Sequence, residues 1–235
     1  MGKFTSITRA YEALRNVAPD LNKNQLAILL GQAKAESDFG DGFETPDGNA
    51  SSNNWGAIYT SGDLGTITRW DTDGNGKPIQ VKAAWNSSPE VGAKQFYDLI
   101  KNNYAPALDK AAAGDLWGYS EALWRNGPCD WPEQAKGCTR PAYYGGFPPG
   151  HKYGLAPASV VPKSPEDRWY RILAYAKFIK GMANVVVKAL GWPDTLVIEP
   201  PPKPGGEEES SMGGSGLLAA GLIGAGAYLV WRSRR

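Results

Sequence analysis

One carboxylic acid in this sequence is placed where it could do chemistry. Leu26, Leu29 and Ala33 are spaced three or four residues apart and would share the apolar face of a predicted helix. The next position on that face is Glu36. Partial burial and the negative end of the helix dipole both disfavour a charged carboxylate, so we expect a raised pKa and a proton retained near neutral pH. Such a group can protonate a leaving oxygen as a general acid. The alternatives are a structural hydrogen bond to a neighbouring loop and a side chain rotated toward solvent.

Other kinds of reactive site have little support in the composition. A structural zinc site takes four N or S ligands, and Cys129, Cys138 and His151 are too few. A nucleophile activated by histidine would depend on His151 alone, which lies in a Gly/Pro-rich stretch. We therefore expect no metal and no organic cofactor. Lys and Arg number 25 against 24 Asp and Glu, so the chain has no general basic field and we expect no nucleic-acid partner.

The segment between the predicted helices in the second half of the chain is rich in glycine and aromatic residues. Cys129 and Cys138 have eight residues between them, and we expect them to form a disulfide outside the reducing cytosol; two free thiols are the alternative. Tyr143 and Tyr144 follow on a Gly-rich loop. Sugar rings stack on aromatic faces, so these two tyrosines are candidate substrate-binding residues.

The elements that must position these residues are mostly helices. Apolar spacing predicts a helix through Ile7, Tyr11 and Leu14, and capping residues predict others from Asn22 or Asn24 to about Ser37, from Ser88 onward, and from Ser164 through Leu190. The segments 66–72 and 79–85 flank Asp73-Gly74-Asn75-Gly76, a strong turn signal, and predict a β-hairpin. The expected fold class is therefore α+β, mainly helical.

The composition changes twice near the C-terminus. Residues 1–198 are predicted to be globular, and residues 199–215 form a linker rich in Pro, Gly and Glu. Residues 216–231 carry no charge and precede a basic tail, 232–235, so we expect a single transmembrane helix with the tail on the cytoplasmic side and the globular domain on the other. Small residues four apart in this segment would allow the membrane helix to self-associate. A buried helix of a soluble protein is the alternative, and no cleavable signal peptide is visible.

The order of motifs in the first half of the chain resembles that of the lysozyme-like peptidoglycan hydrolases. It is most similar to the glucosaminidases of glycoside hydrolase family 73. The motifs are Glu36-Ser37, then Asn53-Asn54-Trp55-Gly56, the hairpin, and the helix start at Ser88-Pro89-Glu90. The resemblance covers about residues 20–105 and continues more weakly to about 190. Soluble lytic transglycosylases share the Glu-Ser pair but have a Gly-Leu-Met-Gln type segment where this chain has Gly56-Ala57-Ile58-Tyr59.

The resemblance implies roles for particular residues. Glu36 would be the general acid, and Asn54, Trp55 and Tyr59 would line the cleft beside it, with Asn54 fixing either a loop or an acetamido group of the sugar. The hairpin would carry a second acid, for which Asp71 is the first candidate; Asp73 is more typical of a turn. Asp63 and Glu44 are possible substitutes for Asp71.

The implied function is cleavage of the glycan strands of peptidoglycan, as a β-N-acetylglucosaminidase or muramidase. A lytic transglycosylase that uses a single acid is one alternative. A non-catalytic glycan-binding or structural membrane protein of a virion is another, and a pore-forming protein is a third. The membrane anchor and the lack of a signal peptide favour a phage enzyme for entry or lysis, located in a virion membrane or outside the cytoplasm; a bacterial wall-remodelling enzyme is the alternative.

Overall fold

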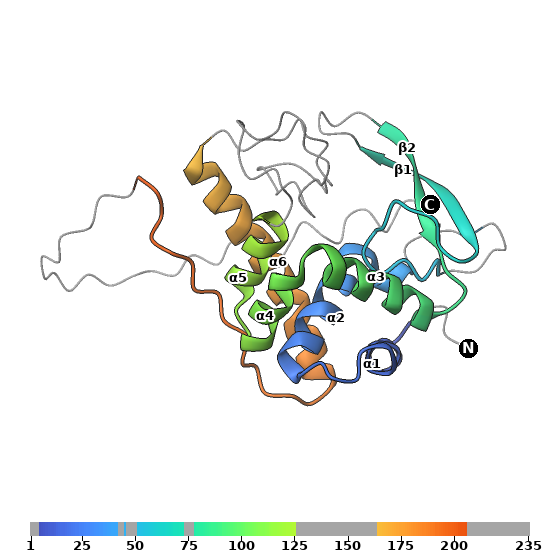
Figure 1. Ribbon diagram of the computed structural model, residues 1–235, viewed down its shortest axis with the longest axis horizontal. Helices are drawn as coiled ribbons and strands as arrows, with labels where there is room; N and C mark the ends of the chain where they lie inside the picture. Colours follow the sequence, from blue (N-terminus) through green and yellow to red (C-terminus); the bar gives the residue numbers. More distant parts are fainter. Residues whose placement is uncertain (1–4, 42–44, 46–50, 73–77, 126–163, 206–235) are drawn as a thin grey trace, which may run out of the picture. The chain divides into compact units, whose positions relative to one another are not determined.

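Helix α2 runs through the middle of the folded chain, and most of the other helices pack around it (Figure 1). The computed structural model describes residues 5–41, 45, 51–72, 78–125 and 164–205. The elements in these ranges are α1 (Ile7–Val17), α2 (Lys23–Ser37), the short 3-10 helix η1 (Asp38–Gly40), β1 (Gly65–Thr72), β2 (Pro78–Trp85), α3 (Pro89–Asn103), α4 (Ala105–Ala113), α5 (Leu116–Arg125) and α6 (Pro165–Ala189). All of them belong to one compact unit, Met1–Pro204, and Gly205–Arg235 is a second unit. The predicted α+β class is confirmed.

Local signals define both ends of α2. The side chain of Asn22 accepts a hydrogen bond from the Gln25 N–H at 3.0 Å, and the side chain of Gln25 accepts one from the Asn22 N–H at 2.9 Å, which completes a capping box. The helix ends at Ser37 because Asp38 adopts a left-handed conformation with φ of 49°. The predicted extent of this helix is therefore confirmed.

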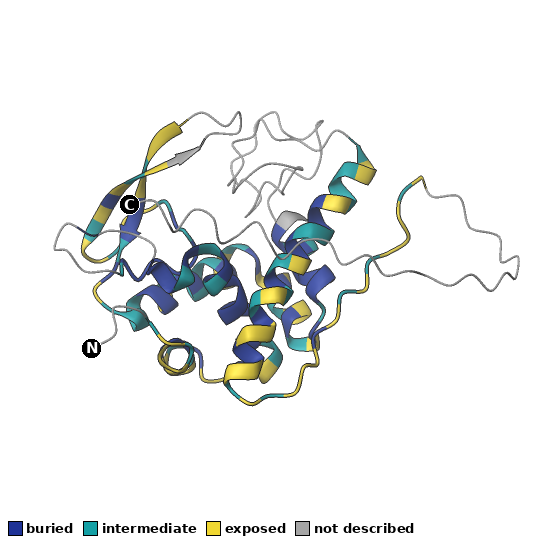
Figure 2. Cartoon of the chain, turned by 180° about the vertical axis from the view of Figure 1, so that it is seen from behind, coloured by how far each residue is buried: buried dark blue, intermediate teal, exposed yellow. Residues whose placement is uncertain are grey.

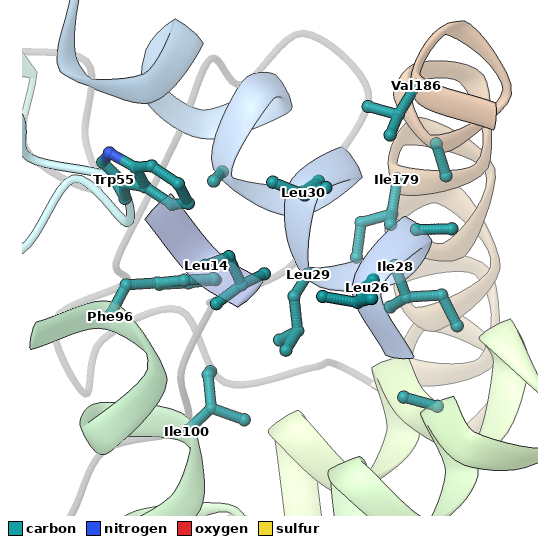
Figure 3. Packing of buried hydrophobic residues seen from close by; sticks show 14 of the residues in the cluster. Leu14, Leu26, Ile28, Leu29, Leu30, Trp55, Phe96, Ile100, Ile179 and Val186 are labelled. Carbon is teal, nitrogen blue, oxygen red and sulfur yellow. The ribbon is translucent and has the colours of Figure 1, made fainter. Parts of the chain in front are cut away.

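The sequence-based interpretation of α2 as a helix with one apolar face is wrong. Its buried residues occupy every side of the helix and include Ala27, Ile28, Leu30, Gly31 and Gln32 as well as the predicted positions. The reason is that α1, α4 and α6 all pack against it. Figure 3 shows Leu26, Leu29 and Leu30 of α2 among residues of α1, α3 and α6. The spacing of Leu26, Leu29, Ala33 and Glu36 therefore does not by itself show that Glu36 lies on a partly buried face.

The contact between α2 and α6 is unusually close at Gly31. A Cβ atom at this position would lie 2.7 Å from Cβ of Ala183 and 2.8 Å from the backbone of the same residue. The residues of α6 that were predicted to form one stripe are all buried, namely Ile172, Ala176, Ile179, Ala183 and Val187. The small residues at the crossing therefore allow the two helix backbones to approach, and the rest of the stripe fills the core.

The other predicted elements are also present. Helix α3 begins after Ser88, whose hydroxyl accepts a hydrogen bond from the Val91 N–H at 3.3 Å, and α6 begins after Ser164, which accepts one from the Asp167 N–H at 3.0 Å. The two strands pair antiparallel, from Gly65 opposite Trp85 to Thr72 opposite Pro78. Most of β2 beyond its last residues is exposed, as Figure 2 shows, so the hairpin projects from the core with its base attached.

The chain after α6 returns to the helical core in a way that the sequence did not predict. Val197 forms an isolated parallel bridge with Asp115, in which the Leu116 N–H donates to the Val197 carbonyl at 2.9 Å and the Val197 N–H donates to the Gly114 carbonyl at 3.0 Å. Further along, the indole N–H of Trp169 donates to the Pro201 carbonyl at 2.9 Å. The first residues of the predicted linker thus lie against α6.

The predicted membrane helix, 216–231, and the basic tail, 232–235, lie outside the described residues. Within the described ranges, no helix combines the length and the apolar character needed to cross a bilayer. The membrane anchor therefore stays a prediction.

Candidate active site

Glu36 lies in the last turn of α2 and is partly exposed. One of its carboxylate oxygens, Oε1, accepts two hydrogen bonds. The side-chain amide of Gln32, one turn earlier on the same helix, donates the first at 3.1 Å. The hydroxyl of Tyr175, on α6, donates the second. The carboxyl group is therefore held at the junction between α2 and α6.

The hydrogen bonds continue from Glu36 into the core. The hydroxyl of Tyr119, on α5, donates to the amide oxygen of Gln32, and Nε2 of Gln32 also donates to the hydroxyl oxygen of Tyr175 at 3.1 Å. Gln32 and Tyr119 are 0% exposed and Tyr175 is 2% exposed. Burial, and secondarily the negative charge of Glu36, raise the pKa of Tyr119 well above its ordinary value of 10.0, so this hydroxyl keeps its proton and donates.

Ser37, the second residue of the Glu-Ser pair, connects the end of α2 to the loop that follows. Its hydroxyl lies 2.9 Å from the carbonyl oxygen of Trp55 and 3.2 Å from that of Ala33, and it accepts a hydrogen bond from the Gly40 N–H at 3.1 Å. The acid is thus followed directly by the residue that anchors the Asn-rich segment. The sequence places Ser37 directly after Glu36 but does not by itself indicate this anchoring role.

The backbone beside Glu36 adopts conformations that residues with a Cβ atom rarely take. Asp38, Phe39, Asn53 and Ala57 have φ values of 49°, 61°, 49° and 47°. Gly40 has φ of 88°, and a Cβ atom there would lie 2.3 Å from the backbone nitrogen of Asn54. The two segments around the end of α2 therefore press backbone against backbone, and a tight turn on each side is the result.

Asn54 and Trp55 do not line a cleft in this structure. Asn54 is 0% exposed; its amide donates to the Ile58 carbonyl at 2.9 Å and its side-chain oxygen accepts from the Ile58 N–H at 2.7 Å. It fixes the loop, which was one of its two predicted roles. Trp55 is also 0% exposed, and its ring centroid lies 5.3 Å from that of Phe39. The ring of Trp55 therefore belongs to the hydrophobic core, and its substrate-binding role stays a prediction.

Tyr59 and Asp71, two further predicted site residues, belong to the hairpin region. Tyr59 is half-buried and packs against Ile67 and Ala83 at the base of the hairpin. The backbone of Asp71 lies in β1, paired with Ile79, and its side chain is outside the described part of the structure. A role for Asp71 as the second acid stays a prediction.

Asp63, a possible substitute for Asp71, has a structural role. It accepts hydrogen bonds from the Ser87 N–H at 2.9 Å and from the Ser87 hydroxyl at 2.5 Å. The bond from this hydroxyl lowers the pKa of Asp63, against a smaller opposing effect of burial. Asp63 is therefore a stable carboxylate that attaches the start of the hairpin to the segment before α3.

Several predicted residues lie outside the described ranges. They are Glu44, Asp73, Cys129, Cys138, Tyr143, Tyr144 and His151. The disulfide and the two sugar-stacking tyrosines therefore stay predictions. Among the residues that the structure does describe, no group of three or more His, Cys, Asp or Glu side chains is placed to hold a metal ion.

Comparisons with known proteins add one distant likeness. No family model and no curated protein matches the sequence. Among solved structures, the catalytic domain of the autolysin Auto from Listeria monocytogenes is similar, with a TM-score of 0.37 and 14% sequence identity over 74% of this chain and 84% of that chain. A likeness of this strength carries no conclusion about what the present chain does.

Proposed function

We propose that the protein is a lysozyme-like glycosidase that cleaves the glycan strands of peptidoglycan, with Glu36 as the general acid. The observation that carries the proposal is the setting of Glu36. A partly exposed carboxyl group lies in the last turn of a helix that is mostly buried, and it is held by two donors from the core. The order of the Glu-Ser pair, the Asn-rich loop, the hairpin and the capped helix supports the choice of substrate.

In the proposed reaction, Glu36 donates its proton to the glycosidic oxygen while the bond from that oxygen to the sugar carbon breaks. The electron pair of the breaking bond stays on the leaving oxygen. The positively charged sugar carbon is then attacked by water, with an acid such as Asp71 assisting, or by the acetamido group of the substrate itself. A lytic transglycosylase would instead close a 1,6-anhydro ring with the sugar's own C6 hydroxyl.

The proposal extends to location. Residues 216–231 would anchor the enzyme in a bilayer with the hydrolase on the non-cytoplasmic side, where Cys129 and Cys138 could form a disulfide. A phage enzyme that opens the cell wall during entry or lysis fits this arrangement. The uncharged segment and the arginines that follow it are the support for this part of the proposal.

The test compares the full-length wild type with Glu36→Gln on purified peptidoglycan, with the products identified by mass spectrometry. Gln retains an oxygen that can accept the bonds from Gln32 and Tyr175, so the variant should fold normally while lacking the proton. Glu12→Gln, at an exposed site on α1, is the matched control. We expect the wild type and the control to release muropeptides and Glu36→Gln to release none.

The products also identify the bond. A new reducing N-acetylglucosamine end indicates a glucosaminidase, a new reducing muramic acid end a muramidase, and a 1,6-anhydro end a transglycosylase. Release by a folded Glu36→Gln would remove Glu36 from the proposed role. No release by the wild type from walls of several chemical types would favour a non-catalytic glycan-binding protein.

A further inference from the structure

A fully buried amide lies directly behind Glu36. Gln32 is 0% exposed, and its hydrogen-bond partners come from α2, α5 and α6. Burying an amide costs free energy unless each of its polar groups finds a partner, and an apolar side chain would fill this position without that requirement. The amide oxygen and both N–H groups of Gln32 are bonded, to Tyr119, Glu36 and Tyr175. The site is therefore fully satisfied and specific for an amide.

The partners of Gln32 permit one orientation of the amide. The Tyr119 hydroxyl donates to the amide oxygen, so the NH₂ group turns toward Glu36 and Tyr175. The reverse orientation would place the amide oxygen against the carboxylate oxygen of Glu36, and the two acceptors would repel each other. Tyr119 therefore determines the orientation of the Gln32 amide, and it does so through its hydrogen bond to Gln32.

The consequence falls on the two oxygens of Glu36. Oε1 accepts bonds from Gln32 and from Tyr175, which uses the two lone pairs that a carboxyl oxygen offers. A proton on the same oxygen would compete with these donors. The transferable proton therefore belongs on Oε2.

We propose that Gln32 is a positioning residue for the reaction: oriented by Tyr119 and acting with Tyr175, it keeps Oε1 of Glu36 as an acceptor and assigns the transferable proton to Oε2. This inference rests on the proposed function. During the reaction the Oε2–H bond breaks, an O–H bond forms on the leaving sugar oxygen, and the electron pair of the glycosidic bond stays on that oxygen. The carboxylate that results shares its negative charge between both oxygens, and at Oε1 the two hydrogen bonds become charge-assisted and stabilise it.

The test uses the full-length protein, a soluble peptidoglycan fragment of at least four sugars, and two variants. Gln32→Met removes the amide at similar length, and Tyr175→Phe removes only the hydroxyl. Each loses one donor to Oε1, which stabilises the carboxylate less. We expect kcat to fall by about 10- to 100-fold with KM nearly unchanged, because neither buried side chain can reach the substrate. We also expect the alkaline limb of the kcat/KM profile to move to higher pH.

Two further variants calibrate these effects. Tyr119→Phe keeps Gln32 but removes the bond that orients it, so we expect a smaller loss of kcat in the same direction. Tyr97→Phe, on α3, loses a hydroxyl outside this network and should match the wild type. Among the described residues, the titratable groups bonded to Gln32 are Glu36, Tyr119 and Tyr175; Arg171, one turn before Tyr175 on α6, forms an ion pair with Asp167 at 3.0 Å.

The outcomes separate this inference from the proposed function. Suppose that the wild type is active and Glu36→Gln is inactive, but that folded Gln32→Met and Tyr175→Phe keep full kcat and an unchanged alkaline limb. Gln32 would then have only a packing role, and this inference would be overturned while the proposed function stands. If Gln32→Met fails to fold by circular dichroism, Tyr175→Phe decides by the same two readouts. An inactive wild type would overturn both proposals.

Discussion

The hydroxyl of Tyr175, on the last helix of the described chain, donates a hydrogen bond to Oε1 of Glu36, 139 residues earlier. The candidate acid is therefore not positioned by its own segment alone. Its carboxyl group takes its place only when α6 packs along α2, and the close approach at Gly31 is what allows that packing. Any change that shifts α6 should reach the candidate site through this contact.

We predict that Ser37→Ala lowers both stability and activity. The substitution removes the hydroxyl that joins the end of α2 to the Trp55 carbonyl, and it leaves that buried carbonyl without this donor. The expected loss in the free energy of unfolding is about 1–2 kcal/mol, measured by urea denaturation. Ser61→Ala, at an exposed position, is the control. Equal stability of the two variants would show that the Ser37 hydroxyl does not hold the loop.

Gly31→Ala should be destabilising even though alanine favours helices. The added Cβ would meet Ala183 at 2.7 Å, and the backbone of α6 must move to admit it. We expect a loss of about 1–3 kcal/mol, as is usual when a core is overpacked. Gly181→Ala is the matched control because a Cβ at that helical position meets nothing within 4 Å, so it should gain about 1 kcal/mol. Thermal unfolding of both variants checks the prediction, and a stabilised Gly31→Ala would contradict the described packing.

Asp41 should make a pH-dependent contribution to stability. Burial raises its pKa above the ordinary value of 3.8, although hydrogen bonds from Ser51 and from Thr5 partly oppose this. The folded state therefore binds this proton more tightly than the unfolded state, and the contribution of Asp41 to stability falls as the pH rises through the window above 3.8. Asp41→Asn cannot ionise.

The measurement for Asp41 is the difference in the free energy of unfolding between Asp41→Asn and the wild type. We expect this difference to shift in favour of the variant as the pH rises from about 4 to about 7. Using the difference cancels the other carboxyl groups, some of which, such as Asp63, have lowered pKa values and act in the opposite direction. A shift toward the wild type would contradict the prediction.

The first part of the predicted linker should contribute to the fold. A chain that ends at Pro204 keeps the hydrogen bond from Trp169 to the Pro201 carbonyl and the ion pair between Lys203 and Glu166, whereas a chain that ends at Ile198 loses both. We expect the longer chain to be more stable by about 1 kcal/mol, mainly through the Trp169 bond, because exposed ion pairs contribute little. Urea denaturation of the two chains decides. Identical urea midpoints of unfolding for the two chains would show that the folded domain ends at residue 198.

The membrane anchor can be tested with the same shortened chain. We expect the full-length protein to sediment with phospholipid vesicles and to resist extraction by high salt, because residues 216–231 are uncharged and long enough to approach a full membrane span. The chain that ends at Pro204 should stay in the supernatant and keep its glycosidase activity. Full-length protein that is released by salt would indicate a surface association without a transmembrane helix.

Features that depend on a few neighbouring residues were predictable. The capping box of Asn22 and Gln25, the Ser-Pro starts of α3 and α6, and the turn signal between β1 and β2 act within about four residues. A segment carries such signals wherever it lies in the fold. For the same reason the Glu-Ser pair could be singled out as a candidate from its place at the end of a predicted helix.

The surroundings of the candidate acid followed from long-range packing. Nothing near Gln32 in the chain indicates that Tyr119, 87 residues later, and Tyr175, 143 residues later, supply its partners. The position of Trp55 could not be predicted from its type, because an aromatic ring suits both a sugar-binding surface and a core; the structure buries it against Phe39. Periodicity shows which residues share a helix face. Whether that face meets solvent, substrate or another helix depends on the elements that pack against it, and these come from distant parts of the chain.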